Sequence, residues 1–225
     1  EEASLQREGY IRALTDPAIV DAIRTGFLGK IAVAYVEWAS SQRTVVDWTL
    51  IQDMESARAF AVALRAAPLT SGASTSISGA LDYSALMFEG NGFEGTRQVI
   101  DISGDGRNQA GRPLRFARAD TLADGITINA LPMLIYDPTG RELNAGLDRY
   151  YFEQVIGGPG AFAMVARGFD AFPEAIRRKL FIEIAGVAPA GRDVVTGTRF
   201  TRPPHFFADA RDAEVWRRAL EPGAR

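Results

Sequence analysis

Apolar and polar residues recur along this chain with two different periods, and the period changes at short polar segments. Apolar positions three to four residues apart are typical of amphipathic helices, whereas β-branched and aromatic runs between turn residues are typical of strands. The predicted helices cover residues 3–24, with a kink or restart at Pro17, and 53–66, 76–88, 113–123, 146–155 and 170–185. The predicted strands cover residues 29–40, 43–51, 97–103, 126–135 and 161–166.

The order of these elements predicts the fold class. The first two strands are separated only by a polar turn at Ser41 and Gln42, so they should form a hairpin. The remaining strands alternate with helices, which is typical of an open, mostly parallel sheet with helices on both faces. We therefore expect a three-layer, doubly wound α/β domain with one antiparallel edge strand contributed by the hairpin.

The chain is long enough for one large domain with an appendage. Its 225 residues are 47% apolar and 24% charged, which is ample material for a core. The regular pattern ends after Gly186, where Pro, Gly and Thr follow one another without a period. We assign residues 1–186 to the domain and residues 187–225 to an arm or tail, with a possible short helix over 208–220.

Two helix starts carry recognisable signals. Ser74 or Thr75 can cap the helix predicted over 76–88, because a hydroxyl there accepts a backbone N–H. Asp170 can cap the helix over 170–185, and Pro173 suits its first turn.

Composition excludes several kinds of site. The net charge is −3, so nothing favours a nucleic-acid surface. There is no cysteine, which removes disulfides and thiolate chemistry, and His205 is the only histidine available to a catalytic triad. The longest apolar runs are too short to cross a bilayer.

Two loops offer candidate chemistry. Asp105 follows a buried strand, and Thr75 precedes a helix, so both can lie at the carboxyl edge of the sheet, where ligands bind in this fold class. A hydroxyl and a carboxylate are suitable partial ligands for Mg²⁺. The structural alternatives are a helix cap for Thr75 and a Gly-flanked turn for Asp105.

Three other polar residues are candidates for either a functional or a structural role. Glu37 and Asp101 lie in strands that should be mostly buried, and we expect structural pairing more than chemistry at both. Asn108 follows Asp105 closely and can either hold the metal loop, or contact a ligand, or serve as a plain turn residue.

A hairpin followed by TSISGAL and VIDISGDGRN resembles the von Willebrand factor A domain. The resemblance extends over about residues 4–186 and is closest to a bacterial branch of unknown function, on the phrases LQREGY, YVEW, VIDISGDG, ITINALP, VIGGPGAF and AIRRKL. It implies a metal-ion-dependent adhesion site (MIDAS) for Mg²⁺, or Mn²⁺ or Ca²⁺, in which Thr75 and Asp105 are metal ligands. Ser74, Ser103 and Asn108 are candidates for ligand contact or for support of those two residues.

The chain departs from the family pattern in one respect. A D-x-S-x-S loop, which in the family follows a central first strand and supplies three metal-site residues, is absent. Each buried apolar side chain of such a strand contributes roughly 1.5–3 kcal/mol, and a whole domain has only about 5–15 kcal/mol of stability. We therefore expect either an upstream segment or strand addition by another segment to fill the place of this strand.

The resemblance implies a function as a protein-binding, adhesion-type module rather than an enzyme. A partner protein would offer an acidic side chain to the open metal position, and the location would be periplasmic or secreted. One alternative is a metal-assisted hydrolase that uses Asp105 with Asp47, Asp53 or Asp137. The other is a structural domain whose metal site has decayed.

Overall fold

The computed structural model describes residues 2–69, 72, 74–186 and 194–196. The helices are α1 (Glu2–Leu14), α2 (Pro17–Thr25), α3 (Met54–Ala66), α4 (Ile77–Leu86), α5 (Leu114–Ala123), α6 (Leu147–Tyr150) and α7 (Phe172–Ala185). A π-helical turn at Tyr151–Val155 continues α6, and a 3-10 turn at Phe169–Ala171 precedes α7. The strands are β1 (Ile31–Trp38), β2 (Gln42–Ile51), β3 (Val99–Gly104), β4 (Thr127–Leu134), β5 (Phe162–Met164), β6 (Ala166–Arg167) and β7 (Val194–Thr196).

The strands form two separate sheets. β1 and β2 form the predicted antiparallel hairpin, with Ile31 opposite Ile51 and Trp38 opposite Gln42. In the other sheet β3 pairs in parallel with β4, which pairs in parallel with both β5 and β6. The outer strand β7 is antiparallel to β5. The fold class is therefore confirmed as a mostly parallel α/β arrangement with one antiparallel hairpin.

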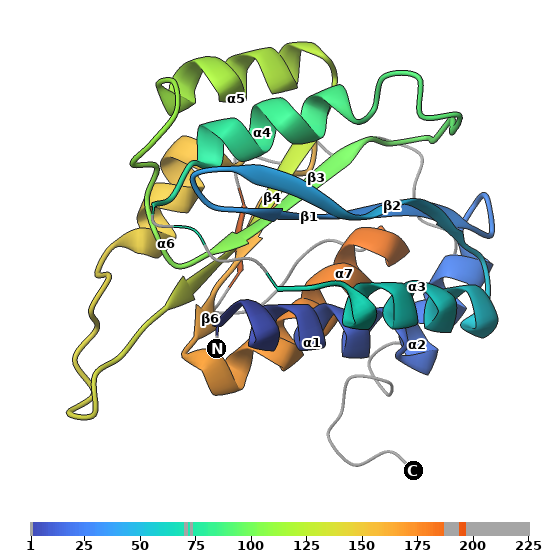
Figure 1. Cartoon of the computed structure of the whole chain (residues 1–225), viewed down its shortest axis with the longest axis horizontal. Coiled ribbons are helices and arrows are strands. Elements are labelled where there is room, and N and C mark those ends of the chain that lie inside the picture. The colour runs from blue at the N-terminus through green and yellow to red at the C-terminus, as the bar shows by residue number, and fades with distance from the viewer. Residues whose placement is uncertain (1, 70–71, 73, 187–193, 197–225) are drawn as a thin grey trace.

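Helices cover both faces of this arrangement (Figure 1). Helices α4 and α5 lie on one face, where their apolar residues pack with β3, β4 and the π-helical turn in one core cluster. Helices α1, α2, α3 and α7 lie on the other face and pack in two further clusters, one against the hairpin and one against β4 and β5. The result is the three-layer sandwich that the sequence predicts.

Local signals explain most of the helix boundaries. The predicted restart at Pro17 is confirmed: Asp16 accepts the N–H of Ala18 (2.8 Å) and Pro17 opens α2. Asp53 caps α3 through a reciprocal capping box with Ser56. Gly186 ends α7 with a φ of 65°, a left-handed conformation that favours glycine.

Three predictions need correction. Asp170 does not cap α7, because its segment winds into the 3-10 turn and the N-cap position falls to Ala171, which has no capping side chain. The helix predicted over 146–155 has only one α-helical turn before its hydrogen bonds change to the π pattern. The strand predicted over 161–166 is split into β5 and β6.

Most of the predicted arm lies outside the described residues. Its described part is β7, which extends the sheet beyond β5. The helix predicted over 208–220 and the single histidine, His205, both fall outside the description.

Candidate functional site

The two predicted metal ligands come together at the carboxyl end of β3. Asp105 directly follows this strand, and Thr75 lies two residues before Ile77, the first residue of α4. Both side chains are half-buried and line the same cavity. The loops touch closely, since a Cβ placed on Gly106 would lie 2.7 Å from the Thr75 hydroxyl oxygen. The Thr75 carbonyl also accepts the N–H groups of Gln109 (2.8 Å) and Ala110 (3.1 Å). The loop after β3 is thus fastened to the loop before α4.

The helix cap is Ser76 rather than Ser74 or Thr75, so this prediction was wrong. The Ser76 hydroxyl oxygen accepts the N–H of Gly79 (3.2 Å) and donates to the Ala110 carbonyl (3.0 Å). One residue earlier, Thr75 is left outside the helix. Its hydroxyl has no hydrogen-bond partner within the described part of the chain.

Asp105 is held through its backbone, not its carboxylate. The Asn144 amide donates to the Asp105 carbonyl and to the Met133 carbonyl, both at 2.8 Å. The Tyr151 hydroxyl donates to the Gly106 carbonyl at 3.2 Å. No hydrogen bond or ion pair joins the Asp105 carboxylate to another described residue. Sequence reasoning missed Asn144 and Tyr151, because nothing in their local sequence points to a loop some 40 positions earlier.

The other candidate residues support the loops. Asn108 accepts the N–H of Ser78 at the start of α4 (2.9 Å), and its own N–H donates to the Tyr150 hydroxyl (3.2 Å). Of the interpretations open for Asn108, loop holding is the one this geometry matches. Ser103 is buried, and its hydroxyl lies 3.4 Å from Tyr10 and from Gln6 of α1. Ser74 is half-buried and lines the cavity beside Thr75.

The donor set fits a hard divalent cation in part. Across the described ranges, no group of three or more His, Cys, Asp or Glu side chains could hold a metal ion. The available ligands are one hydroxyl and one carboxylate, and neither has another described partner. Mg²⁺ accepts such oxygens when water or further oxygens complete its octahedron. Thr75 and Asp105 thus bring together two oxygen donors of the kind that Mg²⁺ accepts.

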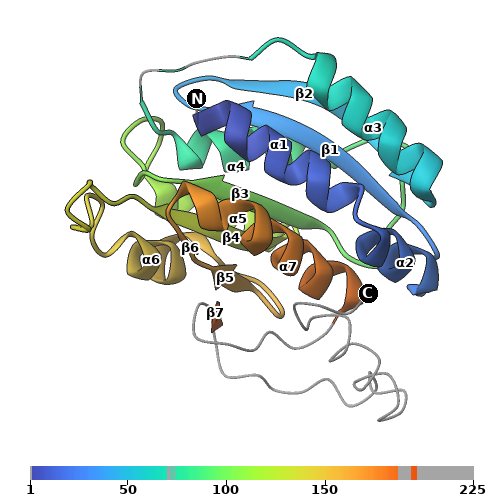
Figure 2. The same cartoon turned by 90° about the horizontal axis from the view of Figure 1, so that it is seen from below.

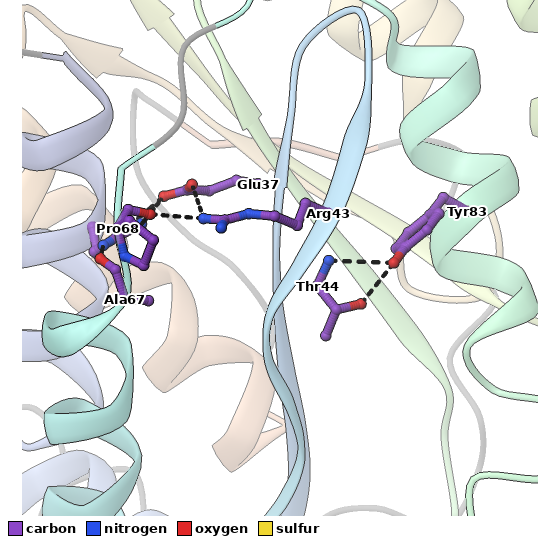
Figure 3. Close-up of polar contacts among 7 residues, drawn as sticks. Glu37, Arg43, Thr44, Ala67, Pro68 and Tyr83 are labelled. Carbon is purple, nitrogen blue, oxygen red and sulfur yellow. Dashed lines mark hydrogen bonds and ion pairs between the residues drawn. The ribbon is translucent and has the colours of Figure 1, made fainter.

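The buried carboxylate on β1 is paired, as expected. Glu37 accepts hydrogen bonds from Arg7 of α1 and from Arg43 of β2 (3.4 Å for the latter). Both guanidinium groups also donate to the backbone carbonyl of Pro68, after the end of α3, and Arg7 donates in addition to that of Ala67. Figure 3 shows Arg43 reaching across the hairpin to Glu37 and Pro68.

The buried carboxylate on β3 belongs to a different cluster. The ammonium of Lys179, fully buried in α7, lies 2.6 Å from Asp101 and 2.8 Å from Glu183. Burial alone would lower the pKa of Lys179, but the two carboxylates raise it above its ordinary value. Burial raises the pKa of Glu183, and the neighbouring charge of Lys179 offsets part of that shift. Structural pairing accounts for Asp101 as it does for Glu37.

The carboxylates suggested for a hydrolase are engaged elsewhere. Asp53 caps α3, and hydrogen bonds from Ser56 hold the pKa of Asp53 below its ordinary value. Asp137 accepts hydrogen bonds from Thr139 and Arg141 within its own turn. Asp47 is exposed on β2 and accepts the N–H of Trp48. Each of the three therefore has a local structural role, and none supplies a second acid or base beside Asp105.

Solved structures with a similar fold include proteins of adhesion and matrix type. The proximal thread matrix protein 1 of the mussel byssus, in a form with a zinc-occupied MIDAS motif, is 15% identical with a TM-score of 0.57, over 82% of this chain and 43% of that one. The pilus adhesin SpaC of Lactobacillus rhamnosus GG, in an open conformation, is 13% identical with a TM-score of 0.59, over 81% and 28%. An aerotolerance-related membrane protein of Bacteroides fragilis is 18% identical with a TM-score of 0.50, over 77% and 87%.

These matches confirm the class of the domain. The fold is that of the von Willebrand factor A type, as the sequence motifs indicated. The chain belongs to the family described as "Protein of unknown function (DUF1194)", whose model matches residues 1–188. It spans less than half of the mussel matrix protein and of the adhesin. The curated proteins give no match. No helix within the described ranges combines the length and apolar character needed to span a membrane.

Proposed function

We propose that this chain is a divalent-cation-dependent protein-binding module of the adhesion type. The observation that carries the proposal is the meeting of Thr75 and Asp105 at one edge of the sheet, where neither oxygen ligand has another described partner. The similar fold of a pilus adhesin and of a matrix protein with zinc in its MIDAS motif supports it. An adhesion role also places the module in the periplasm or outside the cell.

In this mechanism Thr75 and Asp105 would hold Mg²⁺, with Mn²⁺ or Ca²⁺ as the other candidates. Asn144 and Tyr151 bond the backbone of the Asp105 loop, and Asn108 ties that loop to α4, so hydrogen bonds position the loop that carries Asp105. A bound cation supplies an electrophilic position that an acidic side chain of a partner protein can occupy. No covalent step is involved, and binding depends on preorganised oxygens rather than on turnover.

Calorimetric titration with Mg²⁺ and with Mn²⁺ tests this function. We expect saturable binding to the wild type, weakened at least about tenfold by Thr75→Ala and by Asp105→Ala, since even changes in the groups that support metal ligands cost 10–100-fold. The control is Asp47→Ala, which removes an exposed carboxylate whose hydrogen bond among the described residues comes from the backbone N–H of its neighbour Trp48. Binding that neither site variant weakens would refute the proposal. A folded wild type without any binding would favour the structural-domain alternative.

A further inference from the structure

Two sequence phrases to which the proposed metal site gives no role are joined in the folded protein. Arg7 belongs to LQREGY in the first half of α1, and Glu37 belongs to YVEW at the end of β1. Their side chains form a buried ion pair, with only 6% of Arg7 and 11% of Glu37 exposed. Figure 2 shows the start of α1, the turn of the hairpin and the start of α4 at one end of the molecule. The ion pair therefore lies at the end of the molecule where Thr75 precedes α4.

The two arginines that bond Glu37 also hold the chain where it leaves α3. Arg7 donates to the carbonyls of Ala67 and Pro68 (3.2 Å for the latter), and Arg43 donates to the same Pro68 carbonyl at 2.7 Å. Glu37 orients both guanidinium groups, since it accepts hydrogen bonds from each of them. The start of the segment between α3 and α4 is thus fastened to α1 and to the hairpin.

The turn of the hairpin holds the same segment again, closer to Thr75. A Cβ placed on Gly72 would overlap the Ala39 methyl group, so the backbone at Gly72 packs directly against that side chain. Glycine suits such a position because it lets two stretches of backbone approach closely. The Ala39 carbonyl also accepts the N–H of Ser76, the residue after Thr75, at 3.0 Å. The end of the segment is therefore fastened to the hairpin turn as well.

Thr75 consequently lies between two sets of backbone contacts. On one side, its neighbour Ser76 is bonded to the hairpin turn. On the other side, its carbonyl accepts the N–H groups of Gln109 and Ala110 in the loop after β3. A change in the contact with the hairpin should therefore alter where Thr75 lies relative to the Asp105 loop. Groups that orient metal ligands without touching the metal typically change its affinity by about 10–100-fold.

We infer that the end of the hairpin, residues 37–43, is the support that positions Thr75. Glu37 and its two arginines fasten the start of the segment between α3 and α4, and Ala39 fastens its end. All of them are positioning residues, because they act on Thr75 through the backbone of this segment. The inference rests on the proposed function in so far as Thr75 is a metal ligand, but the support itself can be measured without metal.

A steric change and its compensation test this inference. Gly72→Ala places a methyl group against that of Ala39 and should displace the segment. Adding Ala39→Gly makes room, since the next atoms, the Ser40 nitrogen and the Cα of residue 39, would lie at 3.4 and 3.6 Å, which is ordinary contact. In calorimetric titration, Gly72→Ala should bind Mg²⁺ at least about tenfold more weakly than the wild type. The double variant should recover most of the lost affinity.

Amide exchange measured by NMR without metal separates this inference from the proposed function. The N–H groups of Ser76, Gln109 and Ala110 bond to Ala39 or Thr75, so their exchange reports these contacts directly. In Gly72→Ala they should exchange at least about tenfold faster than in the wild type, while the amides of β4 stay protected. In the double variant the wild-type rates should return. A wild type that shows this pattern but binds no Mg²⁺ would refute the proposed function and confirm the support.

Arg43→Met provides a second test that introduces no steric clash. It removes the hydrogen bond to the Pro68 carbonyl and one of the two guanidinium groups that bond Glu37. It should weaken Mg²⁺ binding and speed the exchange of the Ser76 amide. The matched control is Arg65→Met, which removes an exposed arginine of the last turn of α3 that pairs with Glu8 of α1. The control should change neither quantity.

Three results would overturn the inference. The first is wild-type exchange of the three amides in a folded Gly72→Ala protein. The second is a double variant that folds, with β4 protected, but recovers neither the exchange rates nor the affinity, because the clash with Ala39 would then not be the cause. The third is an equal effect of Arg43→Met and Arg65→Met, and this comparison decides the matter if Gly72→Ala does not fold.

Discussion

Two clusters in this protein have the same charge arrangement and nearly the same contact distances. In each, one basic side chain lies between two carboxylates: Lys179 between Asp101 and Glu183, and Arg112 between Asp82 and Asp120. The nitrogen–oxygen distances are 2.6 and 2.8 Å in the first and 2.6 and 2.7 Å in the second. Their environments differ completely. The Lys179 side chain is 0% exposed, whereas that of Arg112 is 40% exposed.

The difference shows that burial, not contact distance, sets the energetic role of an ion pair. Around Arg112, water solvates all three charges whether or not they touch, so the contacts add little. Around Lys179, water is excluded, and each charge depends on the others for compensation. Asp101 has Lys179 as its counter-ion but accepts no further hydrogen bond from the described residues, although it lines the cavity between β1 and β3.

Replacing the central lysine should produce the largest effect. Lys179→Met keeps much of the side-chain volume but leaves Asp101 and Glu183 without their counter-ion in the protein interior. Loss of one partner from a buried ion pair costs about 3–5 kcal/mol. We expect the free energy of unfolding, measured by urea denaturation at neutral pH, to fall by about this amount.

Lys30→Met is the matched control for that experiment. Lys30 is the only other lysine of the chain, and it is exposed in the turn before β1. Surface substitutions of this kind usually change stability by less than about 0.5 kcal/mol. Equal stability losses in Lys179→Met and Lys30→Met would show that the buried cluster has no special energetic role.

The same cluster should make stability fall at alkaline pH. The pKa of Lys179 is raised in the folded protein, so the folded state retains this proton at pH values where the unfolded state has lost it. Its contribution is therefore complete below the ordinary lysine pKa of about 10.5 and is lost as pH rises above it. The unfolding midpoint temperature should drop steadily above that pH.

Lys179→Met should make this pH dependence shallower without abolishing it. Burial also raises the pKa values of Tyr10 and Tyr35, so their protonated forms are favoured in the folded state and their contributions are lost in the same direction as pH rises. The measurement is calorimetric unfolding of both proteins across the alkaline range. An identical slope in wild type and variant would exclude Lys179 as a source of the effect.

The elements of the fold could be predicted from the sequence because their signals are local. Pro17 marked the break between α1 and α2, and the two β-rich runs around Ser41 marked the hairpin. The two cap predictions that failed, for α4 and α7, depended on a choice between nearby residues. Ser76 rather than Thr75 caps α4 because its hydroxyl can reach both Gly79 and Ala110, a contact 34 positions away that no local pattern shows.

The residues of the candidate site were likewise predictable only where the signal is local. Thr75 and Asp105 were identified from the positions of their loops at the carboxyl edge of the sheet, and the structure places them together. The residues that hold the Asp105 loop were missed because Asn144 and Tyr151 act through the backbone carbonyls of Asp105 and Gly106. Because every residue has a backbone carbonyl, such contacts do not restrict the residue types of the loop itself. Long-range support for a loop becomes visible only after the chain has folded.

The smallest change in stability is expected at the exposed cluster of Arg112, Asp82 and Asp120. Arg112→Met removes contacts as short as those of Lys179, but Asp82 and Asp120 remain solvated by water afterwards. The urea midpoint should therefore stay close to that of the wild type, and any small loss should shrink further when the salt concentration is raised, since salt screens exposed charges. Urea unfolding of Arg112→Met and Lys179→Met at low and high salt provides the measurement. A loss for Arg112→Met as large as that for Lys179→Met would mean that contact geometry, not burial, governs both clusters.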